Sequence, residues 1–220
     1  GGSGDALVFF RDLETSRQVW SRDRGYPGDP WYLDFYKKHE PQGLRLWRVS
    51  DKGELAAKSV YAPEQATARA REHARHFAKL VAEGLRQQAA QGKSALLCSL
   101  YDAELFGHWW HEGPQWLSYL PAELNACGVQ PIACSSYLDR YPTAESLTLP
   151  EGSWGEGGDH RTWLNHETGW AWERLYDSEF EFWSFVHECS ASSPAPLKRV
   201  LTQACRELLL MQASDWPFLV

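Results

Sequence analysis

Apolar residues recur every three or four positions between residues 63 and 91, and this spacing predicts the longest helix of the chain. Pro63 suits the first helical position, where a missing N–H leaves no bond unmade, and Gly92 suits the end. The charged residues in between indicate a solvated face, so we interpret His73 and His76 as surface or packing residues. The apolar stripe consists of Ala66, Ala70, Ala74, Phe77, Leu80, Val81 and Leu85.

Short apolar or alternating runs at residues 6–10, 44–49, 95–100 and 129–134 are typical of β-strands. The last two runs flank a helix predicted over residues 114–127. A strand, a helix and a strand in this order indicate a parallel sheet. The predicted fold class is therefore α/β with parallel strands, followed by an α-helical part.

The last third of the chain is predicted to be helical. Asn165 suits the cap of a helix that runs to about residue 190, and most of the aromatic residues in it are expected in a core. A final helix begins near residues 194–196, where its own apolar stripe starts. Residues 215–220 resemble the start of a buried strand, so we expect the chain to be truncated at this end.

This pattern divides the chain into three parts. Residues 1–4, which are rich in glycine, are predicted to be a linker or loop. Residues 5–150 hold the strands and the long inserted helix. Residues 151–220 hold a loop rich in glycine and tryptophan and the helical domain.

Composition narrows the classes of partner. The 220 residues carry a net charge of −7 and no basic stripe, so we expect no nucleic-acid partner. Twelve tryptophans against one methionine is an unusual ratio, and several of these large side chains with a polar N–H are expected to line a groove.

The location is predicted to be cytoplasmic. The five cysteines form no C-x-x-C pair, which favours reduced thiols in a cytoplasmic protein. Neither a signal peptide nor an apolar run long enough to cross a bilayer is evident, so we expect no membrane partner.

The densest group of reactive side chains follows the run at residues 95–100. Asp102 comes directly after this run, and a second carboxylate, two histidines and two tryptophans follow within ten residues. A carboxyl group that moves a proton, surrounded by flat rings that hold sugars, suits carbohydrate cleavage. Taken alone, an aspartate at this place is more often only the cap of the next turn, and a second cluster shifts the balance.

A metal site is the competing interpretation of His108, His111 and Glu112. Their spacing is not that of H-E-x-x-H, so structural histidines are favoured and we expect no metal and no cofactor.

A second cluster, at residues 152–165, places four glycines around Trp154, Glu156 and Trp163. Glycine allows a ligand to approach the backbone closely. Phosphate-loop motifs are absent and Glu156 and Asp159 would repel phosphate, so a neutral polyhydroxyl ligand fits better.

Two long stretches resemble glycoside hydrolase family 57. Residues 101–114 look like its fourth sequence region, closest to that of its 1,4-α-glucan (glycogen) branching enzymes, and residues 153–165 are similar to its fifth region. Residues 19–29 and 212–218 also match stretches of that subgroup. The resemblance covers nearly the whole chain after residue 4 and implies the C-terminal part of a distorted (β/α)7 barrel, followed by a helical domain.

The resemblance implies retaining transfer on α-1,4-glucan, in which a cut chain is rejoined through an α-1,6 link. Asp102 matches the general acid/base, and Trp154 and Trp163 match tryptophans of the glucan and acceptor sites. Trp20 matches a further aromatic of the cleft. Asp215 and His108 are additional candidates for binding the sugar.

The nucleophile that the family carries is a glutamate in its third region, and no such region is found here. The implied partners are therefore glucan or glycogen chains and an N-terminal part of the same enzyme. A family 57 4-α-glucanotransferase or α-amylase, and a non-catalytic glucan-binding fragment, stay open as alternatives.

Overall fold

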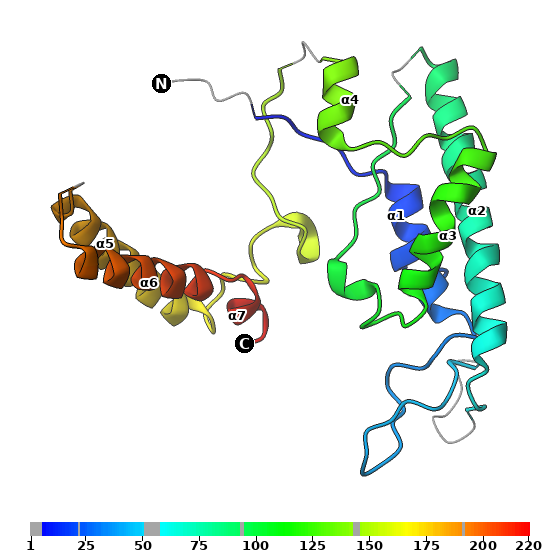
Figure 1. The fold of residues 1–220 in the computed structure, drawn as a ribbon, viewed down its shortest axis with the longest axis horizontal. Helices are drawn as coiled ribbons and strands as arrows, with labels where there is room; N and C mark the ends of the chain where they lie inside the picture. The colour runs from blue at the N-terminus through cyan, green and yellow to red at the C-terminus, as the bar shows by residue number, and fades with distance from the viewer. Residues whose placement is uncertain (1–5, 22, 51–57, 93–94, 143–145, 191) are drawn as a thin grey trace. The chain divides into compact units, whose positions relative to one another are not determined.

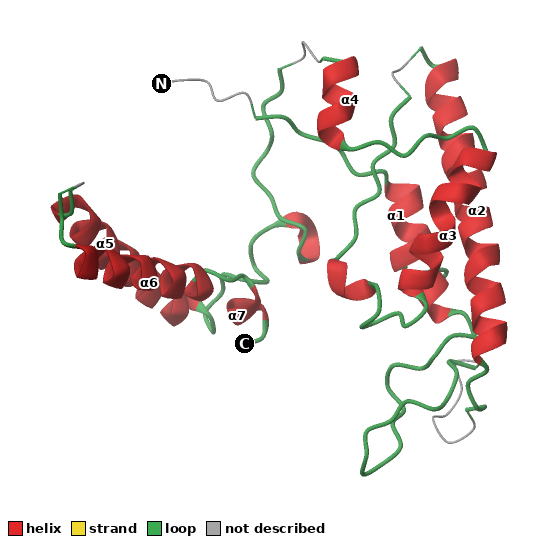
Figure 2. Ribbon diagram, viewed as in Figure 1, coloured by secondary structure: helices red, strands yellow, loops and turns green. Residues whose placement is uncertain are grey.

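The computed structural model describes residues 6–21, 23–50, 58–92, 95–142, 146–190 and 192–220. They belong to two units, Gly1–Thr143 and Ala144–Val220. Helices separated by long loops make up both units, as Figure 2 shows.

The first unit is built around helix α2 (Pro63–Ala90), which packs along α3 (Gly113–Ala126) and against α1 (Leu13–Trp20), as Figure 1 shows. Ala66, Ala70 and Ala74 are fully buried on α2. Small side chains at helical spacing let other elements approach the α2 backbone closely, and Trp116 of α3 fills the core beside them. The predicted long helix and its apolar stripe are confirmed.

Helix α1 was not predicted. Asp12 caps it, since the Asp12 Oδ1 atom accepts bonds from the Thr15 backbone N–H at 2.8 Å and the Thr15 hydroxyl at 2.7 Å. An aspartate at the cap position followed by a short amphipathic run was the available signal, and the preceding apolar run drew the interpretation toward a strand.

The predicted α/β fold class is wrong for the described part of the chain, which contains no strand and is about 53% helical. The parallel strands of a (β/α)7 barrel are therefore not present there. The apolar runs at residues 6–10 and 95–100 carry no strand among the described residues, and Asp12 N–H, which follows the first run, donates to the Cys98 carbonyl of the second at 2.8 Å. A run of apolar residues indicates only a preference for burial, whereas a strand needs a neighbour that continues the ladder.

Residues 32–50 and 58–61, as far as the structure describes this region, form single antiparallel bridges and no strand. Leu33 pairs with Arg48, His39 with Leu44, and Trp47 with Val60. The strand predicted at residues 44–49 is thus reduced to isolated pairings. The first unit also contains the single turns η1 (Tyr26–Gly28) and η3 (Ala103–Leu105) and the short helix α4 (Cys134–Arg140).

The second unit is a pair of packed helices, α5 (Gly169–Glu188) and α6 (Ala195–Met211), with the turn η4 (Glu156–Gly158) before them and α7 (Asp215–Phe218) after them. Two expectations fail here. The strand expected at residues 215–220 is a helical turn, in which Leu219 N–H donates to the Asp215 carbonyl at 3.0 Å. No described residue of α5 is buried, so its aromatic residues do not form a core.

All five cysteines are free thiols. Within the described ranges, none of the helices has the length and apolar character that crossing a bilayer requires.

Gly25 is expected to be intolerant of any side chain. A Cβ there would lie 2.5 Å from the Val19 carbonyl oxygen and would also collide with that of Ser21. Gly25→Ala should therefore lower the free energy of unfolding by about 1–3 kcal/mol, measured by urea titration. The control is Gly169→Ala, which meets nothing within 4 Å at the first position of α5 and should be neutral or slightly stabilising. Equal effects of the two changes would contradict this account.

Candidate functional site

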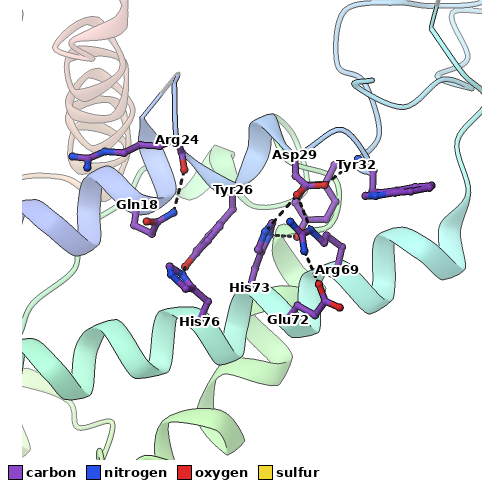
Figure 3. Close-up of polar contacts among 10 residues, drawn as sticks. Gln18, Arg24, Tyr26, Asp29, Tyr32, Arg69, Glu72, His73 and His76 are labelled. Carbon is purple, nitrogen blue, oxygen red and sulfur yellow. Dashed lines mark hydrogen bonds and ion pairs between the residues drawn. The ribbon is translucent and has the colours of Figure 1, made fainter. Parts of the chain in front are cut away.

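Four polar contacts attach residues 24–32 to helix α2 (Figure 3). Tyr26 Oη pairs with His76 Nδ1 at 2.7 Å, and Tyr32 Oη pairs with His73 Nδ1 at 2.7 Å. Asp29 Oδ2 accepts from Arg69 Nε at 2.7 Å and lies 3.5 Å from His73 Nε2. The loop that follows Trp20 is thereby fixed to the longest helix of the unit.

Burial sets the charge state of this network. Desolvation lowers the pKa of His73 to about 4, although the nearby Asp29 carboxylate acts in the opposite direction. Burial likewise raises the pKa of Tyr26 and of Tyr32 far above the ordinary phenol value. At neutral pH, His73 is therefore a neutral imidazole. His73 packs inside this network and His76 is exposed, which agrees with their interpretation as surface or packing residues.

Glu112 is a buried carboxylate at the start of α3, with 1% of its surface exposed. Its Oε1 atom accepts bonds from Leu33 N–H at 3.1 Å and Tyr61 Oη at 2.6 Å. Burial and this bond raise the pKa of Tyr61. Glu112 thus joins three segments of the chain.

The residues of the competing metal interpretation have other contacts. Glu112 is bonded to Leu33 and Tyr61, and the His111 ring lies edge-on to Tyr61 at 6.1 Å. Across the described ranges, His, Cys, Asp and Glu form no group of three or more that could hold a metal ion.

Asp102 occupies the N-cap position of η3, and its side chain is exposed. Its backbone carbonyl accepts from Leu105 N–H at 3.2 Å, but its carboxylate accepts no capping hydrogen bond. The interpretation of Asp102 as a mere cap is therefore not supported by its side chain.

Trp20 lies in the same unit as Asp102 but on a different segment, whereas His108 lies on the segment that follows Asp102. Trp20 ends α1 with 51% of its surface exposed. The exposed His108 ring lies edge-on to Phe35 at 5.4 Å and to Trp109 at 5.2 Å. In the part of the chain that the structure describes, no ring contact or hydrogen bond joins Trp20 to Asp102 or to His108.

Trp154 and Trp163 of the second cluster do come together. Their rings are 5.4 Å apart, and Phe218 of α7 lies 6.3 Å from Trp154 and 6.2 Å from Trp163. Gly155 permits this packing, because a Cβ there would be 2.6 Å from the Trp163 ring. Phe218 was not predicted as a site residue, since a single phenylalanine near the end of a chain carries no signal of its own.

Hydrogen bonds hold the backbone of Trp163 in place. Its carbonyl accepts from Thr168 Oγ1 at 2.9 Å and from Trp172 Nε1 at 2.8 Å. Asn165 Oδ1 accepts from the Glu167 and Thr168 amides in the turn before α5. The prediction of Asn165 as the cap is wrong, because Thr168 occupies the N-cap position and the helix begins at Gly169. Asp215 begins α7, the short helix that also carries Phe218.

A cavity of about 470 Å³ lies beside Trp163, within the size range of small-ligand pockets. It lies between the start of α5 and the segment that leads into α7. Rings line it, together with a few polar groups. The lining includes His160, Trp163, Trp170, Trp172, Arg174, Tyr176, Gln212, Ser214 and Trp216.

The arrangement therefore contains two groups of predicted site residues. An uncapped, exposed carboxylate lies in the first unit, together with Trp20 and His108. A triad of rings beside a cavity lies in the second unit, together with Asp215. A carboxyl group can transfer a proton, and flat ring faces can hold a sugar.

Comparison with known proteins shows which proteins the chain resembles. Residues 175–220 match the family model described as 1,4-alpha-glucan branching enzyme, C-terminal. A 1,4-alpha-glucan branching enzyme of Thermococcus kodakarensis is 42% identical over 219 residues, which cover 98% of this chain and 32% of that protein. The chain thus spans about a third of the length of this curated relative.

Solved structures agree with this match. The family 57 branching enzyme of Pyrococcus horikoshii aligns with a TM-score of 0.87 at 42% identity, covering 95% of this chain and 39% of that one. By sequence and by fold, the chain matches the C-terminal part of family 57 branching enzymes. The α-amylase AmyC of Thermotoga maritima aligns less closely than the branching enzyme, with a TM-score of 0.73 at 30% identity, covering 94% of this chain and 42% of that one.

The lowered pKa of His73 predicts how stability changes with pH. The unfolded chain binds a proton at this position near pH 6.5, whereas the folded chain does so only near pH 4. The contribution of neutral His73 to the free energy of unfolding is complete above pH 6.5. It falls by up to about 3 kcal/mol as the pH drops to 4. Urea unfolding at stepped pH should show a shallower dependence for His73→Gln. His166→Gln, at a side chain that is 91% exposed, should keep the slope of the unchanged protein. An unaltered slope in His73→Gln would contradict the assignment.

Proposed function

We propose that this chain is part of a retaining α-glucan transferase that makes α-1,6 branches from α-1,4-glucan, as in glycogen biosynthesis, and that it carries the general acid/base. The main support is the environment of Asp102. Its carboxyl group is exposed and makes no capping bond, and its position matches the family's acid/base. The 42% identity to a named branching enzyme supports the choice of reaction.

In the proposed reaction, protonated Asp102 gives its proton to the glycosidic oxygen as the α-1,4 bond breaks. A glutamate takes the glycosyl group and forms a covalent intermediate. Asp102 then removes the proton from the 6-hydroxyl of an acceptor glucan, whose oxygen displaces the glutamate and forms the α-1,6 bond. Both steps proceed through inversion, so the configuration at the sugar carbon is retained overall.

We place the glutamate in an N-terminal part of the same enzyme. Retention requires two carboxyl groups about 5–5.5 Å apart, and neither Glu104 nor Glu156 has the sequence context of the nucleophile. The coverage of 32% of the relative leaves ample chain for it in that protein. Free thiols at all five cysteines are what a reducing compartment leaves, which supports a cytoplasmic enzyme.

Trp154 and Trp163 are assigned to the acceptor glucan. Trp154 is 70% exposed, and its ring meets Trp163 at 63°, so the pair offers differently oriented faces to a polymer. Apolar ring faces also exclude water, which favours transfer over hydrolysis. Trp20, His108 and Asp215 are assigned contacts with the same substrate.

The similarity to an α-amylase favours one alternative, a hydrolase or 4-α-glucanotransferase of the same family. Linkage analysis of the product separates the reactions, because only branching creates new α-1,6 links. A non-catalytic glucan-binding fragment is the second alternative. Binding without turnover, even when the N-terminal part is supplied, would favour it.

Asp102→Asn in the full-length protein should lower the rate of branching by a factor of about 10²–10⁴, because the amide cannot exchange the proton. The rate of formation of α-1,6 links, followed by NMR of the product, measures this. Glu104→Gln, an exposed carboxylate two residues away, is the matched control and should keep most of the activity. If both variants lost activity equally, Asp102 would not hold the proposed role.

Trp154→Ala should lower the ratio of branching to hydrolysis, since an acceptor that binds poorly leaves the intermediate to water. Trp183→Ala, which removes a 55% exposed tryptophan of α5, should leave this ratio unchanged. The ratio of new α-1,6 links to reducing ends gives the readout. An equal loss of both reactions in Trp154→Ala would refute an acceptor role.

A further inference from the structure

Phe35, His108 and Trp109 form a further aromatic surface. Of these three residues, only His108 has a role in the reaction proposed above. The rings of Phe35 and Trp109 lie 4.4 Å apart at 34°, and His108 lies edge-on to both. We call these three residues the Phe35 surface. It lies entirely within the first unit. Its residues come from the loop at residues 32–50 and from the turn that follows Asp102.

The two adjacent tryptophans of this turn have opposite environments. Trp110 is 1% exposed and packs in the core, whereas Trp109 is 46% exposed. Leaving a large indole in water forgoes the free energy that its burial would contribute, and a ligand that covers it recovers that free energy. Tyr36, next to Phe35, is 74% exposed and extends the same chemistry.

Hydrogen bonds of the buried Asp34 hold the backbone of the Phe35 surface in place. Asp34 is 2% exposed, and its Oδ1 atom accepts from the amides of Tyr36 at 2.9 Å and Lys37 at 2.6 Å. Its Oδ2 atom pairs with Lys58, which also donates to the Val49 carbonyl at 3.2 Å. These contacts fix the backbone on both sides of Phe35. A surface organised in advance loses little conformational entropy when a ligand binds.

A donor lies at the edge of the rings. The Arg45 guanidinium is 5.4 Å from the centre of the Phe35 ring, and its Nη1 atom donates to the His108 carbonyl at 3.3 Å. A guanidinium has five N–H groups, so this contact leaves others for a ligand. Flat apolar faces beside nitrogen donors match a pyranose ring, which presents C–H groups on its face and hydroxyls at its rim.

The Phe35 surface also adjoins the candidate acid. Trp109 N–H donates to the Glu104 carbonyl at 3.1 Å, and Leu105 N–H donates to the Asp102 carbonyl at 3.2 Å. Asp102 and Trp109 are thus parts of one short, hydrogen-bonded turn. A ligand that rests on Trp109 is positioned by the same segment that carries the acid.

We propose that the Phe35 surface, with Arg45 at its edge, binds an α-1,4-glucan chain, and that the exposed face of Trp109 takes one glucosyl ring. The inference rests on the proposed function and adds to it a glucan contact distinct from Trp154 and Trp163. Its role is binding, so it contributes affinity for long chains and takes no part in proton transfer.

The test measures binding of maltoheptaose to the full-length protein by titration calorimetry. Trp109→Ala should weaken binding roughly tenfold, because the stacking face is lost. Trp109→Phe keeps a flat ring and should retain most of the affinity, which separates stacking from misfolding. Trp183→Ala removes an exposed tryptophan of α5 and should bind like the unchanged chain.

The outcomes separate this inference from the proposed function. If Trp109→Ala binds as tightly as the unchanged chain while Trp154→Ala binds more weakly, the Phe35 surface is not a glucan site and the proposed function stands. If the unchanged full-length protein binds no maltoheptaose, both proposals fail. If Trp109→Ala changes only the oligomeric state, measured by sedimentation, the surface is a protein contact and the inference is overturned.

Discussion

The buried carboxylate of Glu112 is the constraint on which the first unit depends. It accepts hydrogen bonds from Leu33 N–H, in the loop at residues 32–50, and from Tyr61 Oη, just before α2. Glu112 itself lies at the start of α3. A buried carboxylate must be hydrogen-bonded, because leaving it without partners is costly. The three segments therefore adopt their positions together. The turn with Asp102 and Trp109 leads directly into this residue, so the geometry of the candidate site follows from it.

The helices were predictable where the pattern is local. The apolar stripe of α2, with Pro63 and Gly92 at its ends, needs nothing beyond its own residues to be recognised. The supposed strands at residues 6–10 and 95–100 are different, because pairing depends on a neighbour that a one-dimensional pattern does not specify. The aromatic residues of α5 show the same limit of a one-dimensional pattern. An apolar helix face predicts burial, but it does not say which element covers it, and Phe180 is 76% exposed among the described residues.

The features of the candidate site also divide into those that the sequence indicates and those that only the structure shows. The sequence was sufficient to single out Asp102, Trp154 and Trp163, because each lies in a long and specific stretch. It did not show that Asp102 lacks a capping bond, that Phe218 joins the two tryptophans, or that Trp109 and Trp110 face opposite ways. Those properties arise from contacts between residues far apart in the sequence. Side-chain direction within a turn is set by such contacts and not by residue type.

The carbonyl of Trp163 has a consequence for the second unit. It accepts from both Thr168 and Trp172, one before α5 and one inside it, so the loop is tied to the helix at two points. The freedom of this loop is therefore lost when the protein folds and not when a ligand arrives.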